Sequence, residues 1–231
     1  MNEIKAHLEK ARKISREKHH LILHKIHKKY KISKQTLFYI KEYGPHSHVP
    51  NTILKESIQI LLVAAIITAA GGMALEKIKE LFVAIIPLVV LLPVLNDTIG
   101  GYGSIISSRF STMLYEGKRV EKWWKSRELK KLFFQVLIIS MLTTSLSAVI
   151  ALIFSLFSNY EVTFIGALKI MLITMVDALL LILIMFISSI CIGLHYYWKK
   201  EDPNNFMIPI ITSIADFGNM IILAILVVWF F

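Results

Sequence analysis

Five long apolar runs separated by short polar segments constrain what this chain can fold into. They cover about residues 53–75, 81–114, 132–157, 164–194 and 205–231 of a chain of 231 residues that is 55% hydrophobic. A helix of about 20 apolar residues crosses the hydrocarbon core of a bilayer, and a helix satisfies its own backbone hydrogen bonds there. The sequence therefore predicts an all-α integral membrane protein, with five transmembrane helices in residues 51–231.

The second run is too long for one straight helix and contains several helix-disrupting residues. Between them stand two polar residues, Asn96 and Asp97. The interrupting residues are Pro87, Pro93, Gly100, Gly101 and Gly103. Broken helices are tolerated at membrane depth where the freed backbone groups line a cavity or bind something. We expect a broken second helix whose break, from Asn96 to Gly103, supplies backbone oxygens.

Basic residues predict the orientation of the spans. The segment 116–131 carries seven Lys and Arg residues, the segment 158–162 carries none, and twelve precede residue 50. Because basic residues favour the cytoplasmic side, we expect a multi-pass protein of the cell membrane with its N-terminus in the cytoplasm and its C-terminus outside. The single cysteine, Cys191, excludes an intrachain disulfide.

Residues 1–50 form a separate basic segment that we predict to be helical and cytoplasmic. His20, His24 and His27 share one side of such a helix, where they could bind a transition metal. The alternative is a cationic helix that rests on anionic lipid headgroups. The basic residues lack interleaved aromatic residues, so we expect no nucleic-acid partner.

Asp216 is an acidic residue in the middle of the last apolar run, which contains no Lys or Arg. At 1.5 Å per residue it lies roughly 16 Å from Asn205, about half the hydrocarbon core. Intramembrane acids mark an ion path or a buried partner. The alternative is a protonated carboxyl that is hydrogen-bonded between helices. Asp177, in the fourth run, either pairs with Arg109 or Lys169 or joins the ion path.

Two polar stretches resemble the MgtE family of magnesium transporters and channels, together with its related solute carriers. They read PVLNDTIGGYGSIISSRFST at residues 93–112 and DPNNFMIPIITSIAD at residues 202–216. The family has a proline-rich second span that enters a Gly-Asn or Gly-Gly turn and a Ser-Arg-Leu-Ser/Thr-Thr run. It also has a later Asp-Pro-Asp-Asn segment that ends on an aspartate. The resemblance extends over about residues 53–231.

The resemblance implies a set of cation-binding residues. The family's pore aspartate corresponds to Asp216, its partner one turn earlier to Thr212, and the acid at the cytoplasmic mouth to Asp202. Asn205 would help Asp202 to gather hydrated cations. The family's Gly-Asn reads Gly100-Gly101 here, so Asn96 or Asp97 would replace the asparagine ligand. Bacterial members also carry a large acidic sensor domain with paired nucleotide-binding-type repeats, which has no counterpart in the basic segment 1–50.

Magnesium chemistry fits these residues independently of the resemblance. Mg²⁺ prefers oxygen ligands and keeps several of its waters, so one or two carboxylates suffice to hold it. Thr212 and Asn219 lie four residues before and three after Asp216 on one helix face. Five spans are too few to enclose a pore, which predicts a homodimer in the lipid bilayer. Oxygen ligands also accommodate Mn²⁺, Co²⁺ or Ca²⁺ as the transported ion.

Other classes of function fit the sequence less well. The acidic residues are too scattered for a membrane enzyme, and no HExxH, GxSxG or P-loop motif is present, so we expect no enzymatic activity. A non-transporting membrane scaffold predicts that replacing Asp216 changes nothing about ions. A proton- or sodium-coupled cation exchanger is the remaining transport alternative, because acids near the midplane suit both ions.

Overall fold

The computed structural model describes residues 49–115, 125–158, 160–199 and 202–231. Within these residues it contains six helices and no strand. They are α4 (Val49–Glu76), α5 (Lys79–Ala84), α6 (Ile86–Tyr115), α7 (Arg127–Phe157), α8 (Phe164–Trp198) and α9 (Pro203–Phe230). Almost all of the basic segment 1–50, including its histidines, lies outside the described residues, so its prediction stays a prediction.

Five of these helices are long and apolar enough to cross a membrane, namely α4, α6, α7, α8 and α9. The prediction of an all-α membrane fold is therefore confirmed. Side-chain caps mark the starts of two spans: Ser126 Oγ accepts a hydrogen bond from Leu129 N, and Thr163 Oγ1 accepts one from Gly166 N. Such caps satisfy backbone donors that have no partner within the helix.

The second span is interrupted, but not where the sequence predicts the break. The interruption lies at Ile85, between α5 and α6, and Pro87 follows in the first turn of α6, where proline is tolerated. From Ile86 to Tyr115 the helix is continuous, through Pro93 and through the glycines. The predicted break from Asn96 to Gly103 is therefore wrong. Gly103 serves close packing instead, since a Cβ there would lie 2.9 Å from Ile211 Cγ2 on α9.

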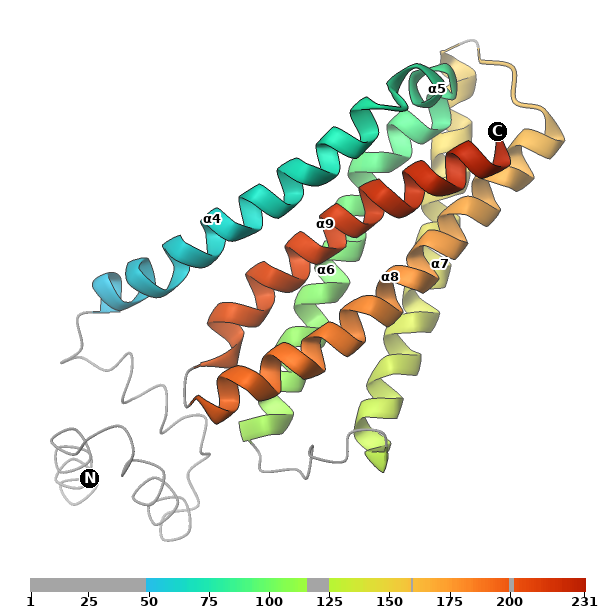
Figure 1. Cartoon of the computed structure of the whole chain (residues 1–231). Helices are drawn as coiled ribbons and strands as arrows, with labels where there is room; N and C mark the ends of the chain where they lie inside the picture. Colours follow the sequence, from blue (N-terminus) through green and yellow to red (C-terminus); the bar gives the residue numbers. More distant parts are fainter. Residues whose placement is uncertain (1–48, 116–124, 159, 200–201) are drawn as a thin grey trace, which may run out of the picture.

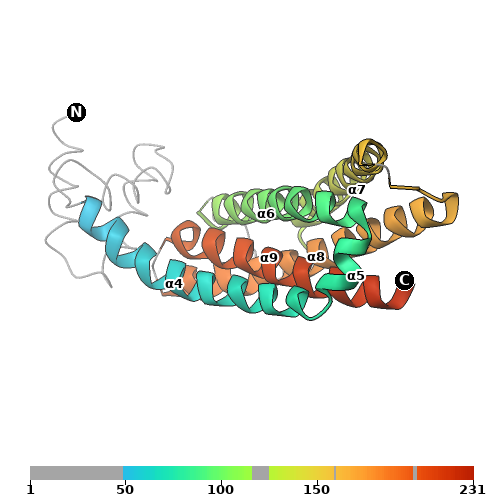
Figure 2. The same ribbon diagram turned by 90° about the horizontal axis from the view of Figure 1, so that it is seen from above.

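Helix α9 lies at the centre of the bundle and packs against α4, α6 and α8 (Figure 1). Seen from above, α4 and α6 lie on opposite sides of α9 (Figure 2). Helix α7 completes the bundle by packing against α6 and α8. The chain therefore places α9, which carries Asp216, in contact with three other spans.

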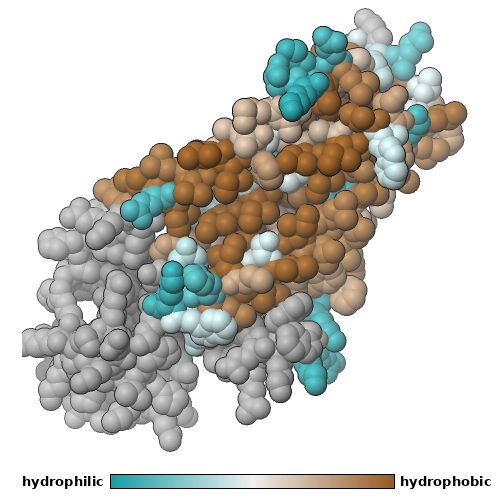
Figure 3. Space-filling model, in the orientation of Figure 1, coloured by the Kyte–Doolittle hydropathy of each residue, from teal (hydrophilic) through white to brown (hydrophobic). Residues whose placement is uncertain are grey.

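The surface of the bundle matches a lipid environment. Large apolar side chains on α7 and α8, such as Leu142, Leu146 and Ile165, are more than half exposed. The face seen in Figure 3 is mostly hydrophobic, and its hydrophilic residues gather mainly near the two ends of the bundle. With no water in the hydrocarbon core, these side chains face lipid at no cost.

The closest contacts of the bundle predict which glycines are required for packing. A Cβ at Gly193 on α8 would lie 2.7 Å from both Met207 Sδ and Phe110 Cε1, and these two side chains are fully buried. Overpacking of this kind costs about 1–3 kcal/mol. We expect Gly193→Ala to lower the melting temperature of the detergent-purified protein.

Gly72→Ala is the matched control, because a Cβ at this exposed glycine of α4 meets nothing within 4 Å. Alanine stabilises a helix interior by up to about 1 kcal/mol relative to glycine. We expect Gly72→Ala to leave the melting temperature unchanged or to raise it slightly. Equal melting temperatures for the Gly193 variant and wild type would contradict this packing.

Candidate cation site

Asp216 lies where α9 packs against α6. Its side chain is half-buried, and a Cβ at Gly100 of α6 would lie 3.9 Å from Asp216 Oδ1. The carboxylate therefore lies beside α6, and even a Cβ at Gly100 would make only an ordinary van der Waals contact with it. Because the carboxylate is partly exposed, it can receive a cation that retains part of its water shell.

Thr212 lies one turn before Asp216 on the same face of α9 and is also half-buried. Its hydroxyl donates to the carbonyls of Ile208, at 2.9 Å, and Pro209, at 3.0 Å. The hydroxyl proton therefore points at the backbone, and the oxygen presents its lone pairs. Lone pairs are what a cation or the hydrogen of its bound water requires.

Asn219 follows Asp216 by three residues but serves a different purpose. Its side chain is fully buried, and its Nδ2 donates a hydrogen bond to Oδ1 of Asn96 on α6. This bond ties α9 to α6 within the membrane. The predicted ligand Asn96 thus lies beside Asn219, which is about one turn from Asp216, and its carbonyl oxygen already accepts a hydrogen bond.

A second set of polar and small residues lies on an outward-facing strip of α6. Asp97, Gly101 and Ser108 are exposed, and Ser104 is half-buried. Their spacing of three or four residues places them on one face of the helix. Asp97 therefore points away from the buried interior of the single chain, although it lies near the level of the Asn96–Asn219 hydrogen bond.

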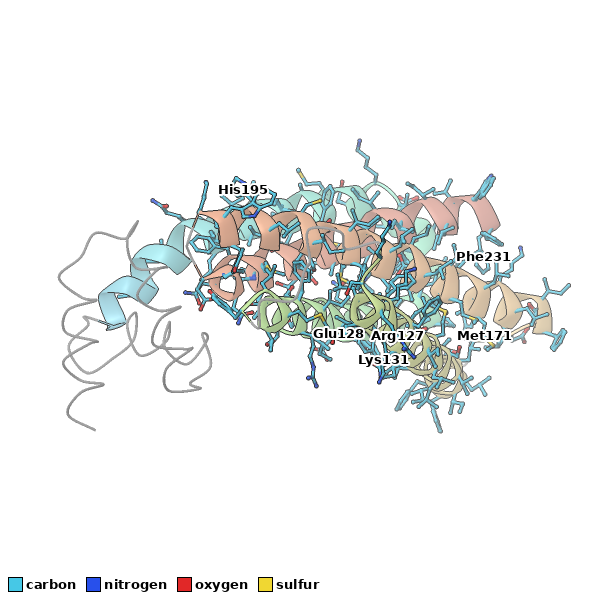
Figure 4. All side chains as sticks on the ribbon, turned by 90° about the horizontal axis from the view of Figure 1, so that it is seen from below. Arg127, Glu128, Lys131, Met171, His195 and Phe231 are labelled. Carbon is cyan, nitrogen blue, oxygen red and sulfur yellow. The ribbon has the colours of Figure 1, made fainter. Side chains whose placement is uncertain are left out.

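Asp202 and Asn205 lie at the start of α9, far from Asp216. Asp202 is the N-cap of the helix: its Oδ1 accepts from Asn204 N at 3.0 Å, and its side chain is only 4% exposed. Fourteen helical residues place it about 21 Å from Asp216 along the axis. His195, near the end of α8, marks the same end of the bundle, whereas Met171 and Phe231 lie toward the other end (Figure 4). The predicted site residues therefore form two groups.

The predicted pairing of Asp177 with a basic residue is wrong. Lys169 Nζ donates to the carbonyl of Phe230 at 2.7 Å and lies 5.0 Å from the centre of the Phe231 ring. Arg109 is exposed on α6. Neither oxygen of Asp177 has a hydrogen-bond partner among the described residues. The sequence shows these charges, but not which of them the packed helices bring together.

No group of three or more His, Cys, Asp or Glu side chains that could hold a metal occurs among the described residues. The arrangement around Asp216 therefore offers one carboxylate and a few neutral oxygens per chain. Such a set is too sparse to bind a fully dehydrated metal. It suits a hard cation that brings most of its own ligands as water.

The model of the MgtE family, described as a divalent cation transporter, matches residues 92–226, which is more than half of the chain. The chain therefore belongs to the MgtE family of divalent cation transporters. The match begins in α6 and ends in α9, so it contains Asp216, Thr212, Asp202, Asn205, Asn96 and Asp97. No curated protein and no solved structure matches the chain.

This membership establishes the class of the molecule. It is a multi-pass membrane protein of a transporter family, not of an enzyme family, and its substrate class is the divalent cation. The resemblance inferred from the two polar stretches is thus confirmed.

The capping geometry of Asp202 yields a test that separates its two roles. Asp202→Ala removes both the cap and the charge, and the loss of a cap costs about 0.5–2 kcal/mol. Asp202→Ser keeps a capping oxygen and removes only the charge. We expect the Ser variant to melt close to wild type and the Ala variant to melt lower. Equal melting of the two variants would contradict the capping role.

Proposed function

We propose that the chain forms a homodimer that moves hydrated Mg²⁺ across the membrane along a path lined by Asp216. The observation that carries the proposal is the partly exposed carboxylate of Asp216, held against Gly100 inside a bundle of membrane-spanning helices. An intramembrane carboxylate without a basic partner is costly unless it serves an ion. Thr212 supplies the next oxygen along the path.

The outward-facing strip of α6 supports the dimer. In a single chain, Asp97 would direct a carboxylate toward lipid, which costs several kcal/mol. A second copy packed on this face would enclose Asp97, Gly101 and Ser108 together with the half-exposed face of α9. Two copies of Asp216 would then face one dication, which balances their charge. Asn96 and Asp97 would add oxygens beside it.

Asp202 and Asn205 would act at the cytoplasmic mouth of this path. Basic residues of the described chain gather at the same end of the bundle, with Arg127, Lys130 and Lys131 at the start of α7 and Lys199 after α8. By the positive-inside bias this end faces the cytoplasm, which places the end of α9 outside. The carboxylate of Asp202 then offsets local positive charge where cations arrive or leave.

Asp216→Asn is the direct test of the path. The amide keeps the size of the side chain and removes its charge, so folding should persist while the cation loses its counter-charge. We expect the apparent affinity for Mg²⁺, measured as flux into proteoliposomes, to fall at least about tenfold, which corresponds to ~1.4 kcal/mol.

Glu161→Gln is the matched control, since it removes a carboxylate from the exposed loop before α8. It should leave the flux unchanged. Comparing Mg²⁺ with Mn²⁺, Co²⁺ and Ca²⁺ in the same assay identifies the preferred ion. Flux through Asp216→Asn that equals wild type for every ion would exclude Asp216 from the path.

Disulfide cross-linking tests the dimer. The single cysteine, Cys191, is first replaced with serine. Gly101→Cys on the strip of α6 should then cross-link two chains in membranes, because the proposed interface brings this strip close to its copy. Leu142→Cys is the control, because this residue of α7 is 68% exposed on a different helix. We expect dimers on gels only for the first variant, and the reverse pattern would contradict the proposed face.

A further inference from the structure

A second carboxylate within the bundle takes no part in the proposed path. Asp177, on α8, is fully buried, and both of its oxygens lack a hydrogen-bond partner among the described residues. Asp216, in contrast, is half-exposed. The two acids therefore meet different surroundings, and an unneutralised charge at Asp177 would be the more costly one.

Two contacts between α8 and α9 show the level at which Asp177 lies. Lys169 binds the carbonyl of Phe230, and Leu181 Cδ2 would lie 2.5 Å from a Cβ at Gly218. The two contacts are twelve residues apart on each helix, so the two antiparallel helices keep the same register between them. Asp177 is then level with Ile222, which is three residues beyond Asn219.

Contacts between α8 and α6 place Asp177 at the same level independently. Met185 Sδ would lie 3.0 Å from a Cβ at Gly103, and the rings of Tyr115 and Tyr197 are 6.1 Å apart. Twelve residues again separate the contacts on each helix. Asp177, eight residues before Met185, is therefore level with Leu95, next to Asn96. Asp177 thus lies within about one turn of the Asn96–Asn219 hydrogen bond along the bundle.

The described buried polar atoms at this level that lack a partner are all hydrogen-bond acceptors. Oδ1 of Asn219 is buried and has no hydrogen-bond partner among the described residues, like both oxygens of Asp177. The Asn219 amide donor is already used by Asn96. Hydroxyls of the neighbouring α7 are also used, since Thr144 Oγ1 donates to the carbonyl of Ser140 at 2.7 Å. The charged member of this group is the carboxylate of Asp177, and a buried carboxylate is stabilised by a cation or a proton that comes from outside the described residues.

None of the other described ionisable groups supplies that charge. On α6, Asp97 and Arg109 are exposed, and on α9 Asp216 lies six residues, or about 9 Å, from the level of Ile222. The ionisable residues of α7, namely Arg127, Glu128, Lys130 and Lys131, lie in its first turns, more than two turns before Thr144. On α8 itself, Lys169 is engaged with Phe230.

We propose that Asp177 and Asn219 form a binding site for one monovalent cation, either Na⁺ or a proton, where α8 packs against α6 and α9. One carboxylate is neutralised by one positive charge. Both side chains are fully buried, so the site is too enclosed for Mg²⁺, which gives up its waters reluctantly. A proton brings no water shell, and Na⁺, with one charge and a larger radius, gives up its waters more readily than Mg²⁺. A coupling of this ion to cation transport rests on the proposed function, but the site itself does not.

Two measurements on the detergent-purified protein decide whether the site exists, and neither requires transport. Infrared spectroscopy detects the carbonyl stretch of a protonated carboxylic acid. If the site holds a proton, wild type shows this band at neutral pH, Asp177→Asn loses it and Asp216→Asn retains it. If the site holds Na⁺, the acid band is absent. Na⁺ then raises the melting temperature of wild type relative to N-methylglucamine at equal ionic strength, but not that of Asp177→Asn.

Ser189→Ala is the matched control, because Ser189 is a fully buried polar residue of the same helix without a partner among the described residues. It should behave like wild type in both measurements. If Asp177→Asn does not fold, Asp177→Leu replaces it. A wild type with neither an acid band nor a response to Na⁺ overturns the site without any variant. An acid band or a Na⁺ response that persists in the Asp177 variants overturns it as well.

Proteoliposomes then test the coupling. We expect a gradient of the bound ion to change wild-type Mg²⁺ flux at least about twofold, and Asp177→Asn to conduct without this dependence. An unchanged gradient dependence in Asp177→Asn would overturn the coupling. A complete absence of flux from folded wild type would count against the proposed transport, while the spectroscopic result on the site would stand.

Discussion

Close packing around α9 is the constraint on which the rest of this structure depends. In a membrane, helices associate through van der Waals contact and hydrogen bonds, because lipid removes most of the hydrophobic driving force. Small residues let the backbones approach at several points: Gly71 lies against Phe217, Gly103 against Ile211, and Gly218 against Leu181. These contacts fix the rotation of α9, and its rotation decides which of its polar side chains are buried.

The fixed rotation divides the polar residues of α9 between two environments. Thr212 and Asp216 remain half-exposed, whereas Asn219, less than one turn further along, is fully buried and bonded to Asn96. This amide pair holds the register of α6 and α9, which in turn holds Gly100 beside Asp216. The Asn96–Asn219 hydrogen bond, which binds no ion itself, therefore positions the carboxylate of Asp216, which we propose to bind one.

The sequence predicts the spans but not the way they pack. Apolar runs such as residues 164–194 identify α8 to within a few residues, because length and hydropathy alone determine membrane crossing. The location of the break was not predictable in this way. Gly100 and Gly103 read as helix breakers in isolation, but α6 is continuous through both, and Gly103 allows the close approach of Ile211 on α9. The missing partner of Asp177 and the Asn96–Asn219 bond also depend on distances between helices, which periodicity does not encode.

A binding group in a transport path must attract the ion and also release it. A fully buried carboxylate such as Asp177 would hold a dication too firmly, or would exclude it altogether, because the ion would have to lose its water. The half-exposed position of Asp216 avoids both outcomes, since the attraction acts through retained water. The depth of each acid in the bundle therefore suits it to a different ion. Because α9 is packed on both sides, with Asn219 between the levels of the two acids, occupancy of one site can alter the packing that positions the other.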